Sequence, residues 1–136
     1  MSGRHLVLFA CVHNAGRSQM AAAFFNALAD PAKAVALSAG TEPARAVHPE
    51  VVEAMRAAGF DLAGEKPRSV DSVPRHDVEL LVTMGCGPAA CPVAPGAESQ
   101  DWALDDPKGK TPDEVRAIRD AIRVRVERLV TSRGWA

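Results

Sequence analysis

The sequence predicts an α/β protein in which helices cover both faces of a parallel β-sheet. Short apolar runs alternate with amphipathic helical patterns along the chain, and this alternation is typical of strand–helix–strand units. The chain has 136 residues, which suits one hydrophobic core, and no linker or internal repeat divides it. We therefore expect a single domain over residues 1–136.

The first half of the chain alternates two strand patterns with two helix patterns. In the first helix Met20, Phe24 and Leu28 recur every four residues and share one face. The second helix has Pro49 at an early position, where proline is favoured, and Gly59 as its stop. The predicted strands span residues 5–10 and 33–37, and the predicted helices span residues 18–29 and 48–58.

The second half contributes the most apolar strand and the best-signalled helix. Residues 78–84 (VELLVTM) form the third predicted strand, and residues 99–104 (SQDWAL) are a candidate for the fourth. Thr111, Pro112 and Glu114 predict the start of the last helix, because they combine a capping box with proline at the first helical position. One face of this helix carries Val115, Ile118, Ile122, Val126 and Leu129.

Charge and hydropathy narrow the classes of partner. The formal net charge is -1, without the basic excess typical of proteins that bind nucleic acid or an anionic membrane, so we expect neither partner. The apolar run over residues 6–12 is too short to span a bilayer and continues into polar residues. We expect a cytoplasmic protein, and a monomer because no exposed apolar face stands out.

The segment CVHNAGRS joins the first predicted strand to the first predicted helix. Such a loop turns backbone N–H groups into one concavity, and the helix dipole adds positive charge, so the loop predicts a site for a tetrahedral oxyanion. Cys11 would be favoured there as a thiolate nucleophile, and the Arg17 guanidinium can grip two oxyanion oxygens. Gly16 permits close backbone approach, Asn14 can tie the loop to itself, and Ser18 can donate to the thiolate. The candidate oxyanion-binding residues are Val12, His13, Asn14, Ala15, Gly16, Arg17 and Ser18.

Two further cysteines, Cys86 and Cys91, follow the third predicted strand in GCGPAACP. Parallel strands end at the same sheet edge, so this segment should lie near Cys11. An odd number of cysteines does not suit a secreted disulfide framework, which favours a reactive role. The alternatives are two loop cysteines without a role, a zinc site that adds Cys11 and His13, or a first cysteine that is merely buried beside a solvated Arg17.

These motifs together resemble a known family. CVHNAGRS after an apolar strand, with a later Asp-Pro dipeptide, is similar to the CxxxxxRS loop of the low-molecular-weight protein tyrosine phosphatase fold. Within that fold, TMGCGPAACPVAPG followed by DWALDDPKGK resembles the arsenate reductases more closely than the phosphatases. The resemblance implies a three-layer sandwich around a four-stranded parallel sheet of order 2-1-3-4. It also implies reduction of arsenate to arsenite, in the service of arsenic detoxification.

The resemblance to thioredoxin-coupled arsenate reductases further implies a relay of thiols. In it Cys11 attacks arsenate, Cys86 attacks the sulfur of Cys11 as arsenite leaves, and Cys91 then attacks Cys86. Thioredoxin would reduce the resulting disulfide between Cys86 and Cys91. Some similar proteins are instead regenerated by a small thiol such as mycothiol or glutathione, the latter with glutaredoxin, and this alternative stays open.

An acid is needed over the oxyanion to protonate the departing oxygen. By resemblance this general acid is Asp106, directly before Pro107, whereas Asp105 is a loop or capping group. The alternative is a solvated turn, because Asp-Pro is common in turns. The chain contains no tyrosine to flank a phosphotyrosine pocket, and Trp102 is as well explained by the core. A small inorganic oxyanion is therefore favoured, with a phosphomonoester hydrolase as the rival and an oxyanion or redox sensor as a non-enzymatic reading.

Related reductases bind potassium with acidic residues on the first helix and before the third strand. Here those positions fall at Ala22 and near Arg68, so we predict no bound potassium, with Arg68 as a source of positive charge or a plain surface residue. We expect no other metal and no cofactor. Of the histidines, only His13 lies in a motif, and the remaining three, His5, His48 and His76, show no constellation around them.

Overall fold

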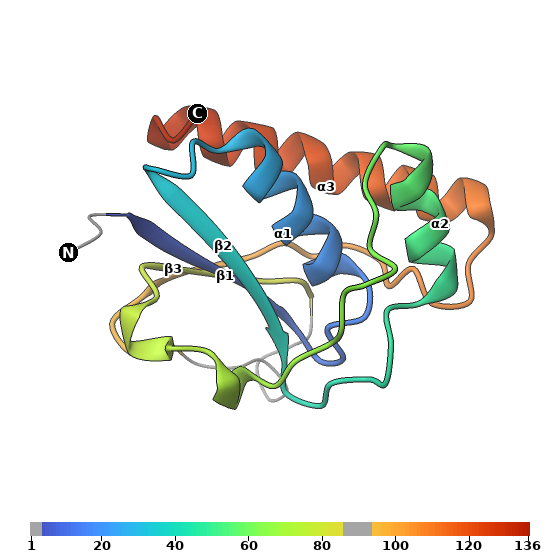
Figure 1. Cartoon of the computed structure of the whole chain (residues 1–136), viewed down its shortest axis with the longest axis horizontal. Helices are drawn as coiled ribbons and strands as arrows, with labels where there is room; N and C mark the ends of the chain where they lie inside the picture. Colours follow the sequence, from blue (N-terminus) through green and yellow to red (C-terminus); the bar gives the residue numbers. More distant parts are fainter. Residues whose placement is uncertain (1–3, 86–93) are drawn as a thin grey trace.

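A four-stranded parallel sheet of order β2-β1-β3-β4 forms the centre of the computed structural model, which describes residues 4–85 and 94–136 (Figure 1). The strands are β1 (His5–Cys11), β2 (Ala34–Gly40), β3 (Leu80–Thr83) and β4 (Glu98–Asp101). The helices are α1 (Arg17–Leu28), α2 (Pro49–Ala57) and α3 (Pro112–Arg133), and two 3-10 turns, η1 (Val70–Ser72) and η2 (Arg75–Asp77), precede β3. The predicted fold class and strand order are confirmed.

The expectation that helices cover both faces holds only in part: α1, α2 and α3 all lie on one side of the sheet, and the other side is covered by the two 3-10 turns (Figure 1). The larger core fills the space under the helices and includes the fully buried Phe9, Phe24 and Ile122. On the opposite face a smaller core joins Leu8 and Leu81 of the sheet to valines in and around the 3-10 turns. Among the described residues, no helix combines the length and apolarity needed to cross a membrane.

The predicted elements appear in the predicted order, and their ends differ where tertiary pairing overrides local signals. The second strand does not end at Leu37 but continues to Gly40, because Ser38–Gly40 pair in register with Phe9–Cys11 of β1. The third strand is shorter than predicted, and the fourth begins at Glu98 and ends at Asp101, one residue before Trp102. The Trp102 side chain is 5% exposed and belongs to the main core.

Parallel pairing brings the ends of β1 and β3 to one edge of the sheet. Ala10 pairs with Thr83, so Cys11 and Gly85 both follow at this edge. The chain then returns through β4, where the Trp102 N–H donates to the Thr83 carbonyl at 2.7 Å. The loop that follows Trp102 therefore starts beside the end of β3, on the same edge as Cys11.

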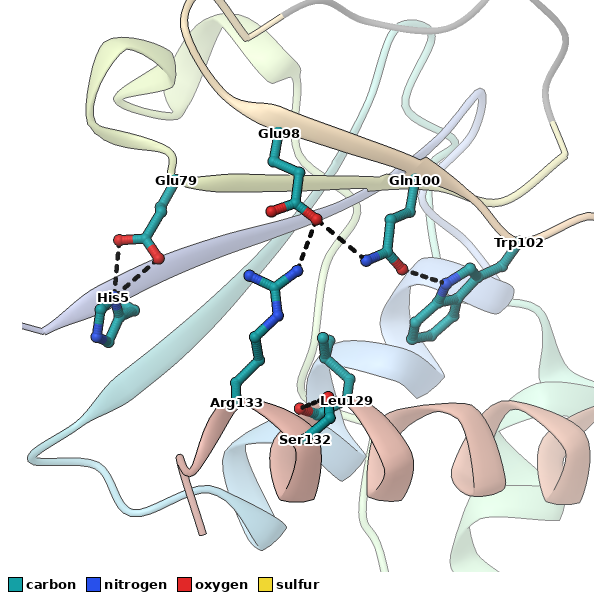
Figure 2. A network of polar contacts seen from close by, with 8 residues as sticks. All are labelled: His5, Glu79, Glu98, Gln100, Trp102, Leu129, Ser132 and Arg133. Carbon is teal, nitrogen blue, oxygen red and sulfur yellow. Dashed lines mark hydrogen bonds and ion pairs between the residues drawn. The ribbon is translucent and has the colours of Figure 1, made fainter.

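Polar contacts fasten the edge strand β4 to the last turns of α3 (Figure 2). Arg133 donates to Glu98 at 2.6 Å, and the Gln100 side chain joins Glu98 to the Trp102 indole, which donates to Gln100 at 3.1 Å. The hydrogen bond from Arg133, followed by the one from Gln100, holds the pKa of Glu98 below its ordinary value of 4.5. The edge strand β4 is thus tied to the longest helix, which fixes where the next loop begins.

This pairing predicts a pH-dependent contribution of Glu98 to stability. Because the pKa of Glu98 is lower in the folded protein, its contribution is present above the ordinary value and is lost as the pH falls through the folded value. The difference in unfolding free energy between wild type and Glu98→Gln should shrink between about pH 7 and about pH 3. Denaturant titrations measure it, and Glu127→Gln, whose ion pair with Arg123 is 3.9 Å long, is the matched control. A difference that stays constant over this range would contradict the assignment.

Candidate active site

A cavity of about 240 Å³ opens at the carboxyl end of β1. It brings together most of the predicted oxyanion-binding residues with Arg17 and the Asp106 carboxylate, although Asp106 lies ninety-five positions after Cys11 in the chain. Cys11 is 4% exposed at the floor of this site. The residues that line the cavity are Cys11, Val12, His13, Ala15, Gly16, Arg17, His48, Gly85 and Asp106.

The loop of residues 12–16 is held from outside by the segment of residues 42–48. Three carbonyls of the loop accept backbone N–H groups from that segment at 2.8–3.0 Å. In a trans peptide the N–H points away from the carbonyl, so the N–H groups of His13, Asn14 and Gly16 are turned away from the outer segment, and two of these residues, His13 and Gly16, line the cavity. In the described part of the chain, no turn or loop hydrogen bond is donated by an N–H of residues 12–16. The three bonds are Glu42 to Val12, Ala44 to His13 and His48 to Ala15.

Asn14 fixes the turn of the loop from inside. It is fully buried, and its φ of 51° lies in the left-handed region that asparagine tolerates better than most residues. The Arg68 N–H donates to its side-chain oxygen at 3.0 Å, and the Gln19 amide donates to its carbonyl at 3.1 Å. Its own amide donates to the Ser18 hydroxyl at 2.8 Å. Asn14 therefore lies behind the cavity and supports the loop rather than lining the site.

Ser18 connects this support to the nucleophile. Its Oγ lies 2.9 Å from the Cys11 sulfur. Since the Asn14 amide donates into the same Oγ, the hydroxyl proton is free to be donated to sulfur. Ser18 therefore places a hydrogen-bond donor directly at the sulfur of Cys11.

Arg17, the first residue of α1, forms a second wall. Its Nη1 donates to the Leu104 carbonyl at 2.6 Å, which fixes the half-buried guanidinium beside the loop after β4. A Cβ on Gly85 would lie 3.4 Å from the same nitrogen, and the φ of Gly85 is +79°. Glycine at position 85 thus serves the backbone conformation, and a Cβ there would only come into contact with Arg17. Within residues 4–85 and 94–136 the other guanidinium N–H groups have no hydrogen-bond partner, so they can donate to an anion.

The Asp-Pro loop closes the mouth of the cavity. A Cβ on Gly16 would lie 2.9 Å from the Pro107 ring, so the two residues are in tight contact. Asp106 accepts the Lys108 N–H at 3.0 Å, and the Gly109 N–H donates to Glu50 on α2 at 3.3 Å. These contacts hold the Asp106 carboxylate at the rim of the site.

The low-molecular-weight phosphotyrosine protein phosphatase family model matches residues 6–133 of the chain. The chain belongs to this family. Members similar to it include a putative arsenate reductase of Halobacterium salinarum, which is 44% identical over 87% of this chain and 85% of that protein. A glutaredoxin arsenate reductase of Synechocystis is 32% identical over 91% of this chain and 95% of that protein.

A solved structure gives the same relationship in three dimensions. The thioredoxin-dependent arsenate reductase of Corynebacterium glutamicum superposes on this family member with a TM-score of 0.78 and 36% identity. The alignment covers 96% of this chain and 62% of that one. The phosphatase-family fold predicted from the anion loop is therefore shown by sequence and by structure.

Other candidates from the sequence are placed as follows. His13 is exposed, and its Nδ1–H donates to the Glu42 carbonyl at 3.0 Å. Ala22 and Arg68, the positions related to a potassium site, line one separate cavity of about 200 Å³ along α1. Asp105 is exposed and does not line the 240 Å³ cavity.

The cysteines that distinguish the redox interpretation, Cys86 and Cys91, lie outside the described residues. The alternative of a zinc site also needs these two cysteines, so it too lies outside the described residues. Within residues 4–85 and 94–136, no three His, Cys, Asp or Glu side chains are grouped to hold a metal ion.

Sequence reasoning missed two residues of the cavity: Gly85, which follows β3 at the same sheet edge, and His48. His48 precedes α2, and in a parallel sheet the loop that follows β2 ends at the same edge as the loop that follows β1. That rule could have placed the segment after β2 near the cavity. It could not have singled out His48, because a histidine before a proline is not part of a recognisable motif.

Gly40 is in close contact with the loop of residues 12–16, which is called the anion loop from here on. One added methyl group at Gly40 should therefore change both stability and anion binding. A Cβ at Gly40 would collide with the Val12 carbonyl oxygen and lie 3.0 Å from the Asn14 nitrogen. Gly40→Ala should lower the unfolding free energy by about 1–3 kcal/mol and weaken phosphate protection of Cys11 against alkylation. Gly64→Ala is the control, because a Cβ there meets nothing within 4 Å. Equal stability and equal protection in the two variants would contradict this role of Gly40.

Proposed function

We propose that this protein reduces arsenate to arsenite through a covalent Cys11 intermediate. The observation that carries the proposal is a cysteine sulfur 2.9 Å from the Ser18 hydroxyl, at the base of a loop whose residues line a small cavity. Relatives of 44% and 32% identity that are named arsenate reductases support the choice of substrate. The protein is proposed to act as a cytoplasmic monomer.

In the proposed first step arsenate occupies the loop of residues 12–17. Three of its oxygens accept loop N–H groups, and Arg17 compensates the charge that develops. The Cys11 thiolate attacks arsenic while Asp106 protonates a departing oxygen, so a sulfur–arsenic bond forms and water leaves. Arsenic is still in its +5 state at this point, and no electrons have been transferred.

In the proposed second step the electrons come from a second thiol. The Cys86 thiolate attacks the sulfur of Cys11, a disulfide forms, and the sulfur–arsenic electron pair leaves with arsenic as arsenite. Cys91 then attacks Cys86, which frees Cys11 and leaves a disulfide between Cys86 and Cys91. The two electrons of the reduction are thus drawn from two thiols.

The proposed external reductant is thioredoxin. A thioredoxin-dependent reductase at 36% identity and the presence of two further cysteines favour it, because a protein dithiol reduces an exposed disulfide directly. The glutaredoxin reductase at 32% identity favours regeneration by a small thiol with glutaredoxin as the alternative.

The second candidate function is hydrolysis of a phosphomonoester by Cys11 and Asp106. Membership of the phosphatase family favours it, and the same cavity suits phosphate as well as arsenate. A protein without tyrosine and with Lys108 and Gly109 after Pro107 offers little aromatic surface to an aryl ester. For this reason the inorganic oxyanion is the better substrate of the two.

The relay predicts different defects for the three cysteines in a coupled assay. With thioredoxin, thioredoxin reductase and NADPH, arsenate should drive NADPH oxidation in wild type, and Cys11→Ser and Cys86→Ser should abolish it. Cys91→Ser should lose turnover with thioredoxin, because the disulfide then stays on Cys11. The control asks whether the loop of residues 12–16 is intact in these variants. Phosphate should protect Cys11 against alkylation in Cys86→Ser and Cys91→Ser as it does in wild type.

Other outcomes separate the rival functions. No arsenite from wild type, or full activity of Cys11→Ser, would overturn the reductase. Thioredoxin-linked turnover that survives in Cys91→Ser would remove only the last relay step. Aryl phosphate hydrolysis at a rate unchanged by Cys86→Ser, without arsenite formation, would favour the hydrolase.

A further inference from the structure

The cavity is lined by the side chain of His48, which the proposed mechanism does not use. His48 lines it together with Cys11, Arg17 and Asp106. It is half-buried and forms the N-cap of α2. A side chain that lines a substrate cavity without a structural task is a candidate for substrate recognition.

The backbone of His48 is fixed on two sides. Its N–H donates to the Ala15 carbonyl of the anion loop at 2.9 Å, and its own carbonyl accepts the N–H groups of Val51 and Val52 at 3.0 Å each. The residue therefore couples the anion loop to the first turn of α2. With the backbone held, only the two side-chain torsions determine where the imidazole lies.

The imidazole lies against the end of the anion loop. Its Cδ2 is 3.6 Å from the position that a Cβ on Gly16 would take, on the glycine that precedes α1. Among the described residues, neither ring nitrogen has a hydrogen-bond partner, whereas His13 is held by the Glu42 carbonyl and His5 by Glu79. The His48 ring nitrogens are thus available to a ligand in the cavity.

The negative charge of a bound oxyanion is the reason why a further donor in the cavity would matter. A multiply charged oxyanion in a cavity that Asp106 also lines needs hydrogen-bond donors to balance its charge. Arg17 provides one guanidinium, and one of its nitrogens is already bonded to Leu104. Imidazole has at least one N–H in either protonation state, so His48 adds a donor from the α2 side of the cavity.

We propose that His48 binds the oxyanion by donating a ring N–H to an oxygen that the loop N–H groups leave exposed. His48 then determines specificity for an inorganic oxyanion. An ester group on that oxygen would make it a poorer acceptor and would clash with the imidazole ring. The proposal rests on the proposed function only in requiring that the cavity takes a tetrahedral oxyanion.

The test uses inorganic phosphate, which occupies the site without being reduced. Protection of Cys11 from iodoacetamide, read by peptide mass mapping, gives the apparent Kd of phosphate. His48→Phe keeps a ring of similar size but has no donor, and should raise this Kd about tenfold or more. His48→Gln restores an N–H donor and should recover most of the affinity. His76→Gln, at an exposed histidine on η2, should leave the Kd unchanged.

Alkylation without phosphate separates recognition from damage to the loop. Iodoacetamide is uncharged, so its rate constant at Cys11 should stay within about twofold in all variants if the loop is intact. With arsenate, His48→Phe should raise KM more than it lowers kcat. A Kd within twofold of wild type in His48→Phe, or His48→Gln as weak as His48→Phe, would overturn the proposal.

The proposed function fails by a different result. Phosphate protection that depends on His48, in a wild-type protein that forms no arsenite, would sink arsenate reduction and leave the His48 assignment standing. Normal arsenite formation with no effect of His48→Phe on Kd or KM would overturn the His48 assignment and leave arsenate reduction standing. Absence of phosphate protection in wild type would overturn the oxyanion site on which both depend.

Discussion

Three backbone hydrogen bonds between the loop of residues 12–16 and the segment of residues 42–48 determine the chemistry of this site. They occupy the loop carbonyls, so the opposite N–H groups are turned away from the outer segment, and loop residues line a common cavity with Cys11. The register of β1 with β2 makes them possible, because it brings Gly40 beside Cys11 and starts the outer segment next to the loop. A short stretch of parallel sheet thereby holds a glycine-containing turn in one conformation, which suits the anion site that we propose.

The other residues around the cavity are positioned by the segment that follows the edge strand β4. Trp102 anchors the chain to the end of β3, Leu104 then holds the Arg17 guanidinium, and Pro107 rests on Gly16. Asp106 reaches the mouth of the cavity as a consequence of this packing. The same arrangement suits attack on phosphorus and on arsenic, since both anions are tetrahedral and need the same donors. The cavity therefore places Cys11 and Asp106 together, which suits the proposed nucleophile and acid, and in the proposed mechanism the fate of the intermediate depends on thiols elsewhere in the chain.

Local signals in the sequence predicted the α/β class, the order of elements along the chain and a loop between β1 and α1, because these depend on hydrophobic period and on a contiguous motif. They failed where the cause is non-local. The strand that was expected to end at Leu37 continues to Gly40 because β1 offers partners to the end, and no local pattern encodes that. His48 was missed because its role arises from the shared sheet edge rather than from neighbouring residues. The relay through Cys86 and Cys91 comes from family resemblance and lies outside the described residues.

The central claim is that the electrons for arsenate reduction leave through cysteines of this chain in a fixed order. One measurement tests it most directly: fully reduced protein is given arsenate without any external reductant, and its disulfides are mapped by peptide mass after one turnover. The account predicts one arsenite per protein, a disulfide between Cys86 and Cys91, and Cys11 returned to the free thiol. Three free thiols after exposure to arsenate, or a disulfide formed equally well by Cys11→Ser, would contradict it.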